Sequence, residues 1–188
     1  GYPGGRILFN PFGSSLNRLA ISIREPLGKS AIELVQVLGR KMRERIPPAR
    51  IAADAAPVNQ NVDRGDKADL TKFPAPKMWP LDGGKYIGTA DSTITRNPED
   101  GRINLGTYRQ MVQGPKQVGY YTSPGKDANL DRERWWSRGE PMPIASVYGL
   151  DPLLFLVSGT TFPKDVSEYE YAGGNNGDSQ LGSTSTAS

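Results

Sequence analysis

The chain contains neither cysteine nor histidine among its 188 residues. Without cysteine it has no disulfide framework and no Cys-ligated zinc or iron–sulfur site. Without histidine it has no Ser-His-Asp triad and no imidazole metal ligand. The fold must be held by a hydrophobic core, for which 36% hydrophobic residues suffice. Any metal must bind carboxylate, amide and backbone oxygens, which favours Mg²⁺, Mn²⁺ or an alkali ion.

Composition narrows the class further. The 22 glycines and 16 prolines favour strands and turns over a helix bundle, and a net charge of +3 is too small to indicate nucleic-acid binding by itself. No apolar run is long enough to span a membrane. The first five residues, Gly-Tyr-Pro-Gly-Gly, contain neither an initiator Met nor a signal-peptide core. We therefore expect a cytoplasmic protein and a fragment of a longer chain.

The N-terminal part predicts two short strands and one helix. Residues 6–9 and 19–23 are short apolar stretches typical of strands. Ser30 and Glu33 have capping-box spacing at the start of a helix that Pro47 ends. The predicted apolar stripe of that helix consists of Ile32, Val35, Leu38 and Met42.

Four cations lie near the end of this helix, at Arg40, Lys41, Arg43 and Arg45. We favour a solvated helix C-terminus, where cations suit the helix dipole, over a nucleic-acid patch. Residues 52–76 are rich in Ala, Asp, Asn and Pro, which predicts an extended linker.

The second half predicts strands with short helices. Strands are expected at 85–96, 103–112, 117–122 and 143–148, with a hairpin turn at 97–101. Helices are expected at 129–138, from the Asp151-Pro152 pair through Val157, and from Ser167. Residues 174–188 are Gly, Asn, Ser and Thr without apolar periodicity, which predicts a disordered tail.

Local patterns alone single out few chemical groups. Asn104, Gly106 and Arg109 lie on one predicted strand, where Gly106 would let a flat ligand or phosphate approach the backbone. A strand with one Asn and one Arg is more often an ordinary edge strand, which we favour on the local pattern alone. Lys126 and Asp127 follow a Ser-Pro-Gly turn, which could bind a phosphate or be a surface turn.

An ordered series of motifs resembles the UbiD family of decarboxylases over residues 1–173. The motifs are Trp79-Pro-Leu-Asp-Gly-Gly-Lys-Tyr-Ile87, Ile94-Thr-Arg-Asn-Pro98, Asn104-Leu-Gly-Thr-Tyr-Arg-Gln110, Ser123-Pro-Gly-Lys126, Pro141-Met-Pro-Ile-Ala145, Gly149-Leu-Asp-Pro152 and Ser167-Glu-Tyr-Glu-Tyr-Ala-Gly173. Their shared order is far more specific than any single motif.

The resemblance implies an α+β fold with a split β-barrel that binds a flavin, preceded by part of a small α/β domain. The implied division is a partial N-terminal segment and linker at 1–76, the barrel at 77–173 and the tail at 174–188. The family's larger C-terminal domain, which carries the proton-donating Glu, would be absent from this chain.

The resemblance also implies site residues for prenylated FMN and a divalent metal, Mn²⁺ or Mg²⁺, with K⁺ as a further candidate. Asn104, Asp127 and Glu168 match the metal ligands, and Asp127 stands where the family commonly has His. Arg109 matches the catalytic arginine beside the flavin and the substrate carboxylate. The remaining cofactor-contacting positions are Thr107, Tyr108, Lys126, Ser158, Gly159, Thr160 and Thr161.

The implied activity is reversible, non-oxidative decarboxylation of aromatic or α,β-unsaturated carboxylic acids. The alternative is a non-catalytic flavin-binding module or a partner subunit of a longer homologue. Implied partners are the small-molecule acid, a prenyl-FMN synthase that supplies the cofactor, a second polypeptide with the C-terminal domain, and further copies in an oligomer. Neither nucleic acid nor a membrane span is expected.

Overall fold

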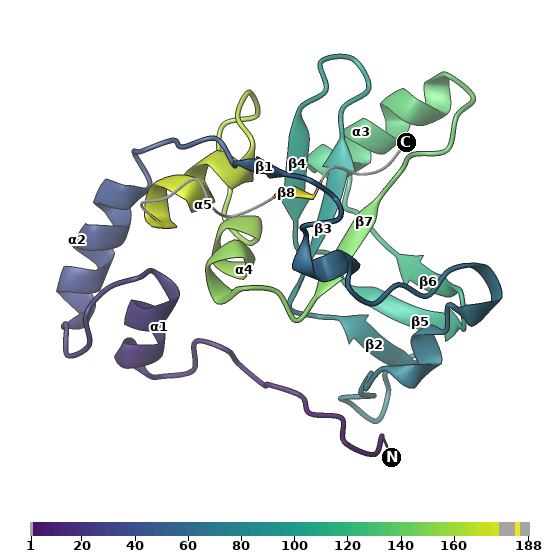
Figure 1. Ribbon diagram of the computed structural model, residues 1–188, viewed down its shortest axis with the longest axis horizontal. Coiled ribbons are helices and arrows are strands. Elements are labelled where there is room, and N and C mark those ends of the chain that lie inside the picture. The colour runs from purple at the N-terminus through teal and green to yellow at the C-terminus, as the bar shows by residue number, and fades with distance from the viewer. Residues whose placement is uncertain (1, 177–182, 185–188) are drawn as a thin grey trace. The chain divides into compact units, whose positions relative to one another are not determined.

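The computed structural model describes residues 2–176 and 183–184. The chain forms two compact units, each built from two separate stretches (Figure 1). Gly1–Phe9 and Asp63–Leu150 form the first unit, and Asn10–Val62 and Asp151–Ser188 form the second. The fold is α+β, as the motifs predicted.

The first unit contains two three-stranded antiparallel sheets. The sheets have the orders β2-β5-β6 and β4-β3-β7 (Figure 1), and within the described residues they do not close into a continuous barrel. The strands are β2 (Lys85–Gly88), β3 (Asp91–Arg96), β4 (Ile103–Gly106), β5 (Gln110–Gly114), β6 (Gln117–Tyr120) and β7 (Ala145–Tyr148).

Two predicted strands are each broken in the structure. The segment 85–96 divides into β2 and β3, and the segment 103–112 divides into β4 and β5. In both cases the first part belongs to one sheet and the second part to the other. The predicted hairpin at 97–101 is confirmed, because β3 pairs with β4 in antiparallel register with Thr95 opposite Asn104.

One helix packs against β3 and β4 in this unit. It is α3 (Asp127–Ser137), which begins two residues before the predicted start at 129 and ends near Gly139, whose φ is +73°. The predicted linker 52–76 contains three short 3₁₀ turns, η1 (Pro57–Asn59), η2 (Gly65–Lys67) and η3 (Leu70–Lys72).

The second unit is mainly helical. Its helices are α1 (Leu16–Ser22), α2 (Ala31–Lys41), α4 (Pro152–Ser158) and α5 (Glu168–Asn176), and β1 (Arg50–Ile51) pairs in parallel with β8 (Ser183–Thr184). The helices meet in one apolar core, formed by Ala20, Ile23, Leu34, Val37, Leu153, Val157, Val166, Tyr171 and Ala172. The predicted N-cap at Asp151 is confirmed by its side chain, which accepts a hydrogen bond from the Leu153 N–H at 2.8 Å.

The predicted strands at 6–9 and 19–23 are wrong. Residues 6–8 have no regular structure and Phe9 lies in a bend, whereas residues 19–22 lie in α1. The Ser15 side chain caps this helix by accepting from the Arg18 N–H, and Ala20 and Ile23 point into the core. The overlooked helical signal was the Ser15 cap followed by apolar residues three positions apart, such as Ala20 and Ile23.

The capping box of α2 is confirmed, but its predicted apolar stripe is partly wrong. Ile32 and Val35 are exposed, whereas Leu34 and Val37 are buried. Leu38 and Met42 do pack against the core as predicted. The buried face is therefore rotated around the helix, because α1 and α5 pack against α2 and bury Leu34 and Val37 in the shared core.

The capping box gives a testable stability effect. Ser30 Oγ accepts from the Glu33 N–H at 3.3 Å, and the Glu33 carboxylate accepts from the Ser30 N–H at 2.8 Å. We expect Ser30→Ala to lower the free energy of unfolding by about 1 kcal/mol, because the Glu33 N–H in the first turn of α2 loses its acceptor. Urea unfolding measures the change. Ser30→Asp keeps an acceptor and should restore most of the loss, and equal losses in both variants would contradict the capping account.

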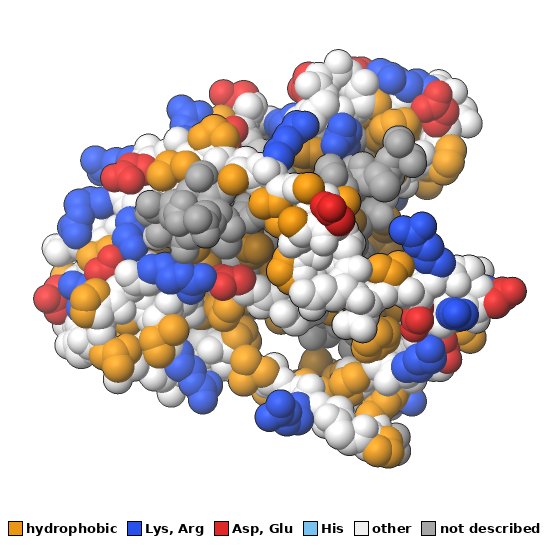
Figure 2. Space-filling model, viewed as in Figure 1, with side chains coloured by type: hydrophobic (Ala, Val, Ile, Leu, Met, Phe, Trp, Pro, Cys, Tyr) orange, Lys and Arg blue, Asp and Glu red, His pale blue; other side chains and the backbone are white. Residues whose placement is uncertain are grey.

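The surface carries many apolar side chains. Figure 2 shows hydrophobic side chains exposed among Lys, Arg, Asp and Glu on the face that it draws. Trp79 and Leu81 of the first unit are exposed to 71% and 98%. Among residues 2–176 and 183–184, no helix has the length and apolar character needed to cross a membrane.

The predicted tail begins too early. Residues 174–176 continue α5 instead of starting a disordered segment. Residues 183 and 184 form β8, and the rest of the predicted tail lies outside the described residues.

Candidate functional site

The site residues implied by the motifs are divided between the two units. The first unit holds Asn104, Thr107, Tyr108, Arg109, Lys126 and Asp127. The second holds Ser158, Gly159, Thr160, Thr161 and Glu168. Each set is described within its own unit.

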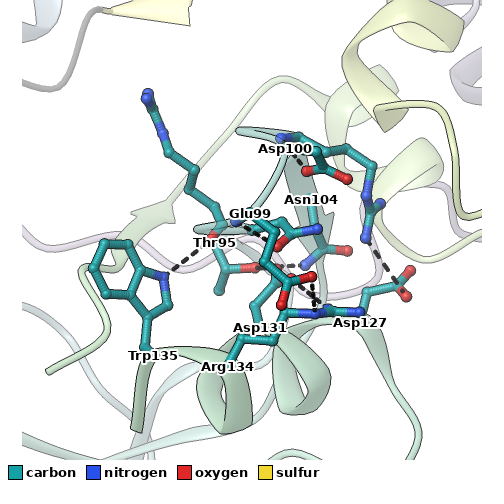
Figure 3. A network of polar contacts seen from close by, with 11 residues as sticks. Thr95, Glu99, Asp100, Asn104, Asp127, Asp131, Arg134 and Trp135 are labelled. Atoms are coloured by element: carbon teal, nitrogen blue, oxygen red, sulfur yellow. Dashed lines mark hydrogen bonds and ion pairs between the residues drawn. The ribbon is translucent and has the colours of Figure 1, made fainter. Parts of the chain in front are cut away.

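Asn104 lies on β4 with its side chain buried in a polar network (Figure 3). Its Nδ2 donates to Thr95 Oγ1 at 3.0 Å, and Thr95 Oγ1 donates to Asp131 Oδ2 at 2.6 Å. Asp131 Oδ1 lies 3.5 Å from Arg134 Nη1, and Arg134 Nε lies 3.2 Å from Glu99. Burial raises the pKa of Asp131, and the Thr95 hydroxyl and the nearby arginines oppose this rise.

Asp127 is the first residue of α3 and is mostly buried. Its Oδ1 lies 3.6 Å from Arg102 Nη2, while Arg102 Nη1 is buried and has no hydrogen-bond partner in the described part of the chain. Lys126 precedes it as an exposed N-cap residue, so the predicted turn brings a cation beside the carboxylate.

This corner of the first unit suits a metal-bound phosphate. The Asn104 amide and the Asp127 carboxylate offer the oxygen donors that Mg²⁺ and Mn²⁺ prefer. The unpartnered N–H of Arg102 and the ammonium group of Lys126 offer donors for phosphate oxygens. The residues present therefore fit the phosphate end of a flavin mononucleotide held through a divalent ion.

Thr107, Tyr108 and Arg109 lie in the break between β4 and β5, where the chain passes from one sheet to the other. Thr107 Oγ1 donates to the backbone carbonyl of Asp91 at 3.1 Å. Arg109 is exposed, and its guanidinium lies 5.5 Å from the centre of the Tyr86 ring. A cation over an aromatic ring is held by the ring quadrupole, so Tyr86 orients Arg109.

The backbone at Gly106 is covered by a side chain of the same unit. A Cβ atom there would lie 2.2 Å from the Tyr108 ring, which itself packs edge-on against Tyr120. The approach of a ligand or phosphate to Gly106 stays a prediction. In this structure the flat group over the glycine is Tyr108.

A second polar network anchors the same break. Gln110 Nε2 lies 2.8 Å from Thr93 Oγ1, 2.9 Å from Ser146 Oγ and 3.2 Å from Asp91 Oδ2, so it joins β5 to β3 and β7. Asp91 is fully buried, and Oδ1 of its carboxyl has no hydrogen-bond partner in the described residues. Burial raises the pKa of Asp91 to about 6. A carboxyl that keeps its proton up to about pH 6 thus lies next to the segment that carries Arg109.

The predicted residues of the second unit lie at two helix ends. Ser158 is the last residue of α4 and Gly159 its C-cap. Thr160 Oγ1 donates to the Leu156 carbonyl at 2.8 Å, and Thr161 is exposed. Glu168 begins α5 and is buried.

Four polar residues of the site escaped the sequence reasoning: Tyr86, Asp91, Thr95 and Asp131. Asp91 and Thr95 share one face of β3 with Thr93, since alternate strand residues point the same way. Polar residues at every second position of this buried strand were the available signal for a polar network on one of its faces. Asp131 gave no signal, because its role depends on the packing of α3 against β3 and β4.

Comparisons with known proteins agree with the motifs. Residues 49–180 match the family model described as "3-octaprenyl-4-hydroxybenzoate carboxy-lyase Rift-related domain" of UbiD. The chain is 32% identical over 178 residues to the pyrrole-2-carboxylic acid decarboxylase of Pseudomonas aeruginosa, covering 91% of this chain and 36% of that protein.

Solved structures show the same fold. The vanillic acid decarboxylase ShVdcCD of Sedimentibacter hydroxybenzoicus matches with a TM-score of 0.85 and 25% identity, over 94% of this chain and 38% of that one. An evolved dimeric form of the UbiD-class enzyme HmfF of Pelotomaculum thermopropionicum, solved in complex with prFMN, matches with a TM-score of 0.81 and 24% identity, over 94% and 40% of the two chains. The chain thus spans little more than a third of the relatives that it matches, and it belongs to the UbiD family.

Proposed function

We propose that this chain provides the prenylated-FMN and metal-binding part of a reversible, non-oxidative decarboxylase of aromatic or α,β-unsaturated carboxylic acids. The observation that carries the proposal is the placement of Asn104, buried on β4, beside the break that presents Thr107, Tyr108 and Arg109. The named activities of the relatives support the substrate class, because pyrrole-2-carboxylic and vanillic acids are both aromatic.

Each residue of the first unit would have a distinct task. Asn104 and Asp127 would hold the divalent ion, with Glu168 of the second unit as the third ligand. Lys126 and Arg102 would bind the phosphate, and Thr107 and Tyr108 would contact the cofactor. Ser158, Gly159, Thr160 and Thr161 would complete the cofactor contacts, and K⁺ would be a second ion beside the phosphate.

Arg109 would bind the carboxylate of the acid that loses CO₂. A guanidinium can form two parallel hydrogen bonds with a carboxylate, which orients the bond to be broken. Bound prenylated FMN would supply the electron sink for the carbon that is left. The proton for that carbon would come from a segment or polypeptide not represented in this chain. The assembled enzyme would be an oligomer, and it would act in the cytoplasm.

The direct experiment is co-expression with a prenyl-FMN synthase. We expect the purified chain to carry the flavin absorption spectrum, the intact-cofactor mass and one equivalent of divalent metal. A folded protein with neither cofactor nor metal would refute the proposal. Bound cofactor without decarboxylase activity on addition of an aromatic acid would favour the second candidate, a non-catalytic cofactor-binding module or a partner subunit of a longer homologue.

The metal part of the proposal has its own test. We expect Asp127→Asn to weaken Mn²⁺ binding roughly tenfold, about 1.4 kcal/mol, because a neutral amide replaces an anionic ligand. Isothermal titration with MnCl₂ measures this change. Asp54→Asn removes an exposed carboxylate of the second unit and should bind as the wild type does. Equal weakening in both variants would show that only net charge matters.

A further inference from the structure

The orientation of the Asn104 amide depends on which neighbour accepts the hydroxyl hydrogen of Thr95. Thr95 Oγ1 lies between two partners, Asp131 Oδ2 at 2.6 Å and Asn104 Nδ2 at 3.0 Å (Figure 3). A threonine hydroxyl has one hydrogen to donate and two lone pairs that accept. With its hydrogen given to Asp131, Thr95 offers only lone pairs to Asn104. The amide must then present its NH₂ group to Thr95.

With Asp131 ionised, the same count excludes the reversed amide. It would place Asn104 Oδ1 against Thr95 Oγ1, so that two acceptors, Oδ1 and the Asp131 carboxylate, would compete for one hydrogen. One of these two oxygen–oxygen contacts would then have no hydrogen between the atoms. Such a contact is unfavourable here, because Thr95, Asn104 and Asp131 are all buried. Asp131 therefore determines which end of the Asn104 amide points away from Thr95.

Asp131 is itself fixed independently of Asn104. It is fully buried on α3, and its Oδ1 lies 3.5 Å from Arg134 Nη1 one helical turn further on. Arg134 is in turn held by Glu99 at 3.2 Å. The chain of contacts thus starts on the surface of α3 and the hairpin turn and ends on β4.

We propose that Asp131, acting through the Thr95 hydroxyl, is a positioning residue that holds Asn104 with its carbonyl oxygen toward the cofactor-bound divalent ion. The inference rests on the proposed function for the ion. The hydrogen-bond relay from Asp131 through Thr95 to Asn104 is itself a property of the free protein. Neither Asp131 nor Thr95 touches the ion, so both act only through the direction of the Asn104 amide.

The test compares four full-length variants. Thr95→Val has nearly the same shape but no hydroxyl, Thr95→Ser keeps the hydroxyl, and Asp131→Leu removes both oxygen acceptors at similar size. Thr122→Val is the matched control, since Thr122 is equally buried in the first unit and its hydroxyl makes only two contacts of 3.5 Å, to Asn129 and Arg132.

Two readouts separate the relay from the metal site. The first is hydrogen exchange of the Asn104 side-chain NH₂, assigned by its loss in Asn104→Asp. We expect slow exchange in the wild type, Thr95→Ser and Thr122→Val, and at least tenfold faster exchange in Thr95→Val and Asp131→Leu. The second is titration with MnCl₂, in which we expect affinity to fall about 10- to 100-fold in the same two variants.

The outcomes are distinct. Slow Asn104 exchange in folded Thr95→Val, or unchanged Mn²⁺ affinity in that variant beside a wild type that binds, overturns the inference. If the wild type binds no Mn²⁺, the metal part of the proposed function is refuted. The positioning role assigned to Asp131 and Thr95 is then refuted as well. Loss of binding in Thr95→Val with recovery in Thr95→Ser supports the inference even where Asp131→Leu fails to fold.

Discussion

Gly173→Ala should lower the free energy of unfolding of the second unit by about 3 kcal/mol. Gly173 lies in α5, where an added Cβ would come within 2.2 Å of the Ile46 carbonyl oxygen. That carbonyl belongs to a backbone segment held against α5 by the hydrogen bond from the Ile46 N–H to the Glu170 carbonyl at 3.0 Å. Because both sides of the clash are backbone, neither can move without breaking this contact. Urea unfolding of the two proteins measures the difference.

Gly39→Ala is the matched control and should have the opposite sign. Gly39 lies in α2, is exposed, and an added Cβ there meets no atom within 4 Å. Alanine is favoured over glycine in a helix by roughly 0.5–1 kcal/mol, so this variant should gain about that amount. If Gly173→Ala were also neutral or stabilising, the close packing of residues 44–46 on α5 would be wrong.

Asp91→Asn should abolish a loss of stability that the wild-type first unit shows between about pH 4 and pH 7. The ordinary pKa of an aspartate is 3.8, and burial raises the pKa of Asp91 to about 6. The folded state therefore holds this proton more tightly than the unfolded state does. Its contribution is fully present below pH 3.8 and is lost as the pH rises through about 6.

The expected size follows from the shift of about two units. At 1.36 kcal/mol per unit, the difference between pH 4 and pH 7 is about 3 kcal/mol. Asparagine resembles the protonated acid in shape and keeps an acceptor for Gln110 and Thr93. The variant should thus match the wild type near pH 4 and exceed it above pH 7.

The measurement is a series of urea unfolding curves for both proteins from pH 4.5 to pH 8. The difference between the two proteins isolates Asp91, because all other titrating groups are common to both. Parallel pH profiles would contradict the account, because they would show that folding does not raise the pKa of Asp91. Asp100→Asn, on the exposed hairpin turn, should leave the wild-type profile unchanged.

Local chemistry allowed several elements to be predicted. The Ser30–Glu33 capping box, the turn at 97–101 and the Asp151-Pro152 start each satisfy backbone groups within a few residues. Their structure does not depend on distant parts of the chain, so short-range patterns identify them. The exposed side of α2 was misjudged for the converse reason, because only its packing partners decide which apolar residues become buried.

The site divides in the same way. The motifs predicted Asn104, Asp127 and Arg109 as chemical groups, and the structure places the first two near one network and the third in the break after β4. The contributions of Tyr86 and Asp131 could not be predicted. Tyr86 reaches Arg109 through strand pairing of β2 with β5, and Asp131 reaches Thr95 across the packing of α3 on the sheet.

The sequence by itself determined the family, the α+β class, the starts of α2 and α4 and the hairpin turn, because motifs, caps and turn residues act over short distances. Only the tertiary structure decided that residues 85–96 and 103–112 bend from one sheet into the other. Each residue in those segments favours a strand, and nothing local distinguishes one long strand from two short ones. The bend arises where Gly88 lets Gln110 and Asp91 pack on its backbone, with an added Cβ only 2.9 Å from Gln110 Cβ and 3.1 Å from Asp91 Cγ. That close packing joins residues that are far apart in the sequence, and it places Arg109 at the corner.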